Sequence, residues 1–129
     1  MTKAERAEMY REYLASEGFP VNIDRDGVVA FKFEGGNYVI LIDEDETYFR
    51  LVYPGFWSID SEEERLRVSL AALHATAQVK VAKVYPRNDD THAAIESFCS
   101  PPEAFKPVFK RSLRALGAAV QCFREKVPG

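Results

Sequence analysis

Residues 28–53, VVAFKFEGGNYVILIDEDETYFRLVY, decide the fold, because their apolar pattern is typical of consecutive β-strands joined by tight polar turns. The pattern predicts three strands, over residues 28–34, 37–42 and 47–53. Gly35-Gly36 forms the first turn, since glycine accepts a positive φ without a Cβ clash. The acidic run Asp43–Glu46 forms the second. Connections this short join antiparallel strands, so we expect an antiparallel meander.

The three predicted strands differ in how apolar their two faces are. The first is apolar on one face and mixed on the other, whereas the second and third carry apolar side chains on both. Tyr38, Tyr48 and Val52 stand where a sheet with one face in water would be polar. If the helices cover only one face, the other face is predicted to meet a second subunit or a partner.

An aromatic turn follows the meander, over Tyr53-Pro54-Gly55-Phe56-Trp57. Pro54 fixes φ and Gly55 frees it, which suits a type II turn. Three rings around a tight turn either close one end of a core or form an exposed recognition patch. We therefore take five residues as candidate partner contacts: Tyr38, Tyr48, Val52, Phe56 and Trp57.

Three helices are predicted around these strands. Residues 2–17 begin with Thr2 and Glu5 at capping-box spacing, and Ser61 and Glu64 begin a second helix in the same way. In the second helix we expect a buried apolar stripe of Leu66, Leu70, Leu73 and Ala77, with Ala71 beside it. The third helix starts at Ser100-Pro-Pro-Glu103 and becomes regular near Val108. It has the strongest amphipathic pattern, with Phe105, Val108, Phe109, Leu113, Leu116, Val120 and Phe123.

Shorter strands complete the predicted sheet. Asp26-Gly27 favours a turn between a short edge strand over 21–24 and the meander. Strands over 78–85 and 91–99 form a hairpin around the polar residues 87–90. The sequence thus predicts one α+β domain over residues 1–129, an antiparallel sheet with three helices in the order α-β-β-β-α-β-β-α.

Composition limits the classes of function. The net charge is -3 and the pI is about 5.4, which argues against nucleic-acid binding by overall attraction to phosphate. No apolar run is long enough for a membrane span, and the first twenty residues lack the apolar core of a signal peptide. Cys99 and Cys122 belong to no CxxC pair or Cys/His cluster. We expect a cytoplasmic protein with two reduced thiols.

No motif for catalysis, a cofactor or a metal ion stands out. Gly35-Gly36 lacks the surroundings of a phosphate loop, and His74 and His92 accompany no nucleophile elbow. Asp43–Glu46 is the one cluster of metal-ligand type, but it lacks the spacing and the glycine of a calcium loop. We expect a solvated acidic turn there, no enzyme activity, and no cofactor.

The second half of the chain, LAALHATAQVKVAKVYPRNDDTHAAIESFCSPPEAFKPVFKRSLRALGAAVQCF, resembles the YbjN-like family of proposed bacterial sensory transduction regulators. In that family a helix rich in Leu and Ala leads into a lysine-bearing strand, a polar turn, a second strand and a long final helix. The resemblance covers most of the chain from about Gly18. It implies a fold similar to that of type III secretion chaperones, which are small acidic homodimers that hold a partner chain on apolar patches. It supplies no catalytic residue.

These observations favour a non-enzymatic protein-binding module, chaperone-like or a regulatory adaptor, that contacts another polypeptide and forms a homodimer. An alternative is a small-ligand-binding or enzymatic domain, with a pocket between sheet and helices and His74 or His92 as its polar group. A further alternative is a purely structural subunit of a larger assembly.

Overall fold

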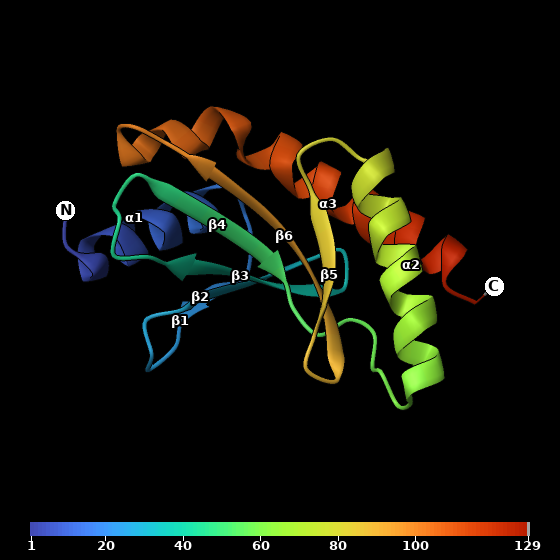
Figure 1. Ribbon diagram of the computed structural model, residues 1–129. Coiled ribbons are helices and arrows are strands. Elements are labelled where there is room, and N and C mark those ends of the chain that lie inside the picture. The colour runs from blue at the N-terminus through green and yellow to red at the C-terminus, as the bar shows by residue number, and fades with distance from the viewer. Residues whose placement is uncertain (129) are drawn as a thin grey trace. The chain divides into compact units, whose positions relative to one another are not determined.

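The computed structural model describes residues 1–128 and contains, within them, three α-helices and a six-stranded sheet (Figure 1). The order along the chain is α1 (Lys3–Ser16), β1 (Val21–Ile23), β2 (Val29–Phe33), β3 (Gly36–Ile42), β4 (Tyr48–Tyr53), α2 (Glu62–Gln78), β5 (Lys83–Arg87), β6 (Asp90–Phe98), a 3₁₀ turn (Pro102–Phe105) and α3 (Lys106–Lys126). The strand order in the sheet is β1-β2-β3-β4-β6-β5. The predicted α+β class with an antiparallel sheet and three helices is confirmed.

The predicted elements differ from the observed ones mainly at their ends. The first meander turn is centred on Glu34 and Gly35, which have φ of 48° and 80°, so Gly36 begins β3. The strand predicted over 78–85 was placed too early, because α2 continues to Gln78 and β5 starts at Lys83. The short edge strand, β1, pairs with β2 in the register Asn22↔Ala30.

Two of the three predicted helix starts have side-chain caps, whereas Pro101 precedes the 3₁₀ turn without such a bond. In α1 the Glu5 amide donates to the Thr2 hydroxyl at 3.1 Å, and the Thr2 amide donates to the Glu5 carboxylate at 2.8 Å. In α2 the Ser61 hydroxyl accepts from the Glu64 amide at 3.1 Å. The Glu64 carboxylate accepts from the amide of Asp60 instead of Ser61. The capping box is complete in α1, and in α2 its return bond is displaced by one residue.

The chain divides into two compact units. The first contains Met1–Val52 and Glu96–Phe109, and the second contains Tyr53–Ile95 and the residues from Lys110 onward. Strand β6 and helix α3 each contribute residues to both units. The expectation of a single domain over residues 1–129 stays a prediction.

An aromatic cluster forms the core of the first unit. The ring of Tyr10 on α1 lies 5.9 Å from Phe49 on β4 and meets Phe105 edge-on at 4.7 Å. Phe31 on β2 lies 5.8 Å from Phe109 at the start of α3. Burial of Tyr10 raises the pKa of its phenol to about 12. Helix α1 and the beginning of α3 therefore contact the face of the sheet that carries Phe31 and Phe49.

A buried arginine connects α1 to the acidic turn between β3 and β4. The Arg6 guanidinium is almost fully buried and donates to the backbone carbonyls of Asp43 at 2.6 Å and Asp45 at 3.5 Å. Lys3 forms an ion pair with Glu44 at 2.6 Å on the surface beside it. The turn is thus held by cations of the first helix, which the sequence alone did not indicate.

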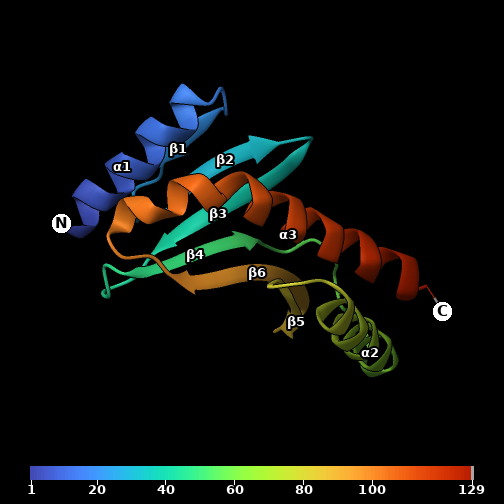
Figure 2. The same cartoon turned by 90° about the horizontal axis from the view of Figure 1, so that it is seen from above.

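The core of the second unit brings α2 against β5, which lie side by side in both ribbon views (Figure 2). The buried side chains of α2 are small: Val68, Ala71, Ala72 and Ala75. The Thr76 hydroxyl accepts from the Val84 amide at 2.9 Å, which fixes the helix to the strand. Small side chains and this bond together place the helix close to the sheet.

Replacing Arg6 with alanine is predicted to destabilise the fold. The substitution leaves two carbonyls in the turn without their charged donor and removes the packing of the arginine stem. We expect the free energy of unfolding in urea to fall by about 2–3 kcal/mol. Arg11→Ala is the matched control, because Arg11 pairs with Glu8 on the surface and should change it by less than about 1 kcal/mol. Equal effects of the two substitutions would contradict a structural role for Arg6.

Candidate protein-interaction surface

Helix α2 exposes the leucines that were predicted to be buried. Leu66, Leu70 and Leu73 have exposed fractions of 63%, 58% and 68%, and Ala77 is exposed as well. The prediction of a buried stripe over these positions was wrong, except for Ala71, which is buried. We refer to Leu66, Leu70 and Leu73 as the leucine stripe.

The reversal has a physical reason, because α2 carries two apolar patterns at helical spacing. Val68, Ala71, Ala72 and Ala75 form the other pattern, and they are the buried residues of a helix that packs on β5. Their small side chains allow the backbone of the helix to approach the strand closely, whereas leucines would hold it away. The helix therefore packs on its own unit through the face with small side chains, and the face with large side chains stays exposed.

Because the leucine stripe is exposed, its side chains do not contribute the free energy of burial to the stability of the fold. Complete burial of one leucine side chain is worth roughly 1.5–3 kcal/mol relative to exposure. Single exposed apolar residues are common on protein surfaces, but contiguous ones are typical of contact sites. Three leucines within two turns of one helix form such a contiguous surface.

Charged side chains lie beside the N-terminal part of the leucine stripe. Arg67 forms an ion pair with Glu63 at 3.2 Å, one turn apart on α2. Arg65 contacts Glu62 at 3.7 Å and Asp89 at 3.0 Å. An apolar centre with a polar rim is the usual composition of a protein–protein interface.

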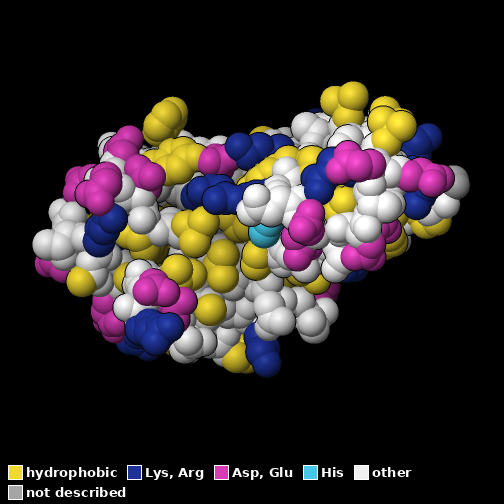
Figure 3. Space-filling model, turned by 60° about the horizontal axis from the view of Figure 1, so that its bottom comes forward, with side chains coloured by type: hydrophobic (Ala, Val, Ile, Leu, Met, Phe, Trp, Pro, Cys, Tyr) yellow, Lys and Arg dark blue, Asp and Glu magenta, His cyan; other side chains and the backbone are white. Residues whose placement is uncertain are grey.

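A second exposed apolar group lies on the sheet of the first unit. Phe98 at the end of β6 is 79% exposed, and its ring lies 6.1 Å from that of half-buried Tyr48 on β4. Arg50 and Glu96 form an ion pair at 3.6 Å on the same strands, and partial burial raises the pKa of the Glu96 carboxyl. In the space-filling view of Figure 3, hydrophobic side chains reach the surface between groups of charged ones.

Two of the five predicted contact residues are not accessible. Tyr38 is 5% exposed and stacks on Phe31, with ring centroids 5.5 Å apart, because its side chain points to the helix-covered face of the sheet. Val52 is 3% exposed. These two residues are removed from the candidate contacts, and Tyr48 is the member of the meander that stays among them.

The aromatic turn packs inward. Phe56 and Trp57 are half-buried and meet Phe123 of α3 edge-on, at 5.3 and 5.7 Å. The Thr91 hydroxyl donates to the Trp57 carbonyl at 2.9 Å. Arg124 lies 5.7 Å from the centre of the Phe56 ring. Of the two interpretations of this turn, its contacts favour closure of the core.

The two histidines occupy different environments. The Gly55 amide donates to Nδ1 of His92 at 3.1 Å, and the His92 ring stacks on Tyr85 at 5.9 Å. His74 is half-exposed on α2 beside the leucine stripe. Both belong to the second unit.

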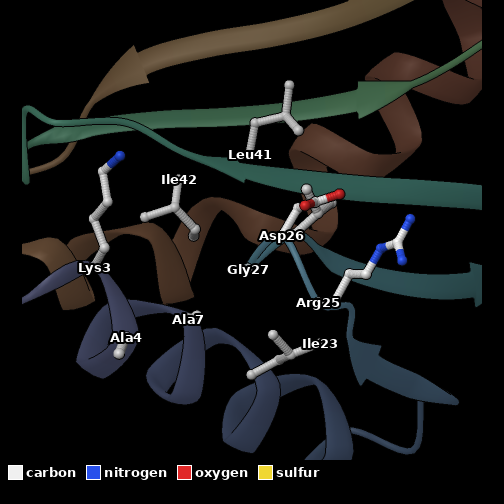
Figure 4. A pocket seen from close by; sticks show the side chains of 10 residues that line it. Lys3, Ala4, Ala7, Ile23, Arg25, Asp26, Gly27, Leu41 and Ile42 are labelled. Carbon is white, nitrogen blue, oxygen red and sulfur yellow. The ribbon is translucent and has the colours of Figure 1, made fainter.

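A cavity of about 470 Å³ lies in the first unit between α1, the β1–β2 turn and the end of β3 (Figure 4). Its apolar walls include Ala7, Ile23 and Ile42, and its charged residues are Lys3, Arg25 and Asp26. The volume is in the range of small-molecule sites. Both signs of charge are present, so the lining does not select the charge of a ligand, and neither His74 nor His92 takes part.

No three or more His, Cys, Asp or Glu side chains within residues 1–128 come together as ligands for a metal ion. None of the helices in this range combines the length and apolar character that crossing a membrane requires.

Comparison with known proteins finds a solved structure with a similar fold. The chain matches no known family model and no curated protein. It is similar to the crystal structure of YbjN from E. coli, a proposed transcription regulator, with a TM-score of 0.63 at 14% sequence identity. The match covers 88% of this chain and 86% of YbjN. At this identity the likeness establishes a YbjN-like fold.

The two faces of α2 are predicted to respond oppositely to the same substitution. Ala75→Leu adds three carbons at a position with no exposed surface against β5, and should lower the free energy of unfolding by about 1–3 kcal/mol. Ala77→Leu makes the same change on the exposed face and should leave it unchanged or raise it. Urea unfolding of both variants measures the difference. A larger cost at Ala77 than at Ala75 would contradict the observed orientation of the helix.

Proposed function

We propose that this protein is a non-enzymatic protein-binding module, a chaperone-like or regulatory adaptor, and that the leucine stripe of α2 contacts another polypeptide. One observation carries the proposal: the large apolar side chains of α2 are exposed while its small ones hold the helix on β5. A helix that served only its own fold would bury the larger side chains, since they contribute more hydrophobic free energy.

The form of the surface favours a polypeptide over a small molecule. Small-molecule sites are concave and enclose most of the ligand. The leucine stripe is the convex side of a helix, and side chains three and four positions apart are the anchors by which amphipathic helices bind helices or grooves. Its charged rim would limit the contact to a partner with suitable polar groups.

The comparison with YbjN supports a regulatory role, and the two cysteines support a location in the cytoplasm. YbjN from E. coli, which has a similar fold, is named as a proposed transcription regulator, a role that depends on contacts with other macromolecules. Cys99 and Cys122 are both free thiols. We therefore propose a regulatory adaptor of the cytoplasm, where thiols stay reduced.

A small-ligand-binding role is the second candidate, supported by the cavity beside α1. Ala7→Leu would fill part of this cavity from the helix side. A metabolite that raises the melting temperature of the natural chain and not of Ala7→Leu would favour this role.

Retention of polypeptides on the immobilised protein tests the leading proposal. The natural chain is compared with the triple variant Leu66→Ser, Leu70→Ser, Leu73→Ser, using extract that also contains an untagged copy of the chain. We expect the natural chain to retain a polypeptide that the variant does not retain. The retained polypeptide is either a foreign protein or the untagged copy. Phe98→Ser is the control, because it removes a similarly exposed apolar side chain from the other unit. Identical retention by all three chains would refute the proposal.

A further inference from the structure

We propose that the cavity beside α1 binds an aliphatic α-amino acid, with its ammonium group at Asp26, its carboxylate at Arg25 and its side chain on the aliphatic wall. The ligand class deepens the small-ligand-binding role, the second candidate function, and rests on it. It does not depend on the leucine stripe, because the cavity lies within the first unit and the stripe within the second. A chain that contacts a polypeptide through α2 can therefore also hold this ligand.

The apolar wall of the cavity is aliphatic. Four of its side chains are half-buried, so they keep surface that a ligand can cover: Ile23, Val28, Leu41 and Ile42. Among the described residues that line the cavity, none is aromatic. A branched aliphatic side chain would remove this apolar surface from water, whereas an aromatic ligand would find no ring to pack against. The volume of about 470 Å³ holds a whole amino acid.

The three charged residues of the cavity are not equivalent. Lys3 is already paired with Glu44 at 2.6 Å. Arg25 and Asp26 form no side-chain hydrogen bond or ion pair with another residue of the range 1–128. Figure 4 shows these two neighbours on the side of the cavity opposite Lys3. One unpaired cation and one unpaired anion therefore stand together at one end of an aliphatic wall.

This pair of charges favours a zwitterion over a ligand with a single charge. A simple carboxylate at Arg25 would place its charge beside that of Asp26, and a simple amine at Asp26 would lie beside the guanidinium. An α-amino acid carries its ammonium and carboxylate groups on one carbon atom. Each group can meet the side chain of opposite charge in a charge-assisted hydrogen bond.

The turn that carries Arg25 and Asp26 is ordered by its own hydrogen bonds. The Asp24 carboxylate accepts from the amide of Asp26 at 2.8 Å and from that of Val28 at 3.0 Å. The Asp24 amide donates to the Val28 carbonyl at 2.9 Å, and Gly27 has a φ of 84°. The backbone at this edge of the cavity is thus already in place, so little of its freedom is lost on binding.

Methyl NMR on the natural chain tests the inference, with leucine and isoleucine added separately to millimolar concentrations. We expect saturable shifts of the methyl resonances of Ile23, Leu41 and Ile42, whereas those of Leu66 and Leu70 in α2 stay unchanged. Glycine has the same charges without the side chain and should bind at least about tenfold more weakly, because it covers none of the aliphatic wall. No saturable shift at the cavity, or equal binding of glycine, would overturn the inference.

Two analogues of leucine test the need for both charges. Isocaproate lacks the ammonium group and isoamylamine lacks the carboxylate, and both keep the branched side chain. Each should bind about tenfold more weakly than leucine, since one charged residue of the cavity then has no partner and lies beside a like charge. If either analogue binds as tightly as leucine, the cavity does not select a zwitterion and the proposal is wrong.

Substitutions at the turn locate the charged contacts. Asp26→Asn and Arg25→Gln should each raise the dissociation constant of leucine about tenfold. Asp60→Asn and Arg87→Gln are the matched controls, because they make the same changes at exposed positions of the second unit and should leave it unchanged. Circular dichroism verifies that all four variants fold. Unchanged affinity in both turn variants would contradict the proposed contacts.

A variant that fills the cavity separates the ligand class from the role on which it rests. Ala4→Leu enlarges an exposed side chain of α1 that lines the cavity, and it should prevent leucine from binding. If leucine and isoleucine do not bind, but another metabolite raises the melting temperature of the natural chain and not of Ala4→Leu, the cavity is a ligand site and the class proposed for it is wrong. Leucine that binds Ala4→Leu and the natural chain equally occupies another surface, which also overturns the inference.

Discussion

Helix α2 has two apolar faces, and its contact with β5 can bury only one of them. The face that packs consists of three alanines and a valine, and it is fixed by the bond between Thr76 and the Val84 amide. Close approach of helix and strand depends on these small side chains. The same packing leaves Leu66, Leu70 and Leu73 in solvent, so the arrangement of the second unit and the proposed interaction surface have one common cause.

The strands and turns of the meander could be predicted from the sequence, because their pattern marks where each strand begins and ends. Strand residues alternate with a period of two, and polar turns of Gly and Asp mark where each strand ends. Tyr38 shows where this reasoning fails. Its place in the alternation is consistent with either face, and the rings of Phe31 and Phe33 next to it bury it on the helix side.

The orientation of α2 could not be predicted for a related reason. Residues 66, 70, 73 and 77 and residues 68, 71, 72 and 75 both follow helical spacing, and hydrophobicity alone favours burial of the leucines. The outcome is decided by how α2 packs on β5, and the hydrophobic pattern of the helix does not contain that information. Arg6 is similar, since nothing near it in sequence indicates that its guanidinium reaches the carbonyls of Asp43 and Asp45.

The acidic first turn of α2 serves the helix and its surface together. Glu62, Glu63 and Glu64 stabilise the positive end of the helix dipole, and two of them pair with Arg65 and Arg67. A bare leucine stripe would promote unspecific association. Charged side chains beside exposed leucines limit which surfaces can cover them, because a buried charge without a partner is costly. In the contact that we propose, these charges would therefore add specificity to a general hydrophobic attraction.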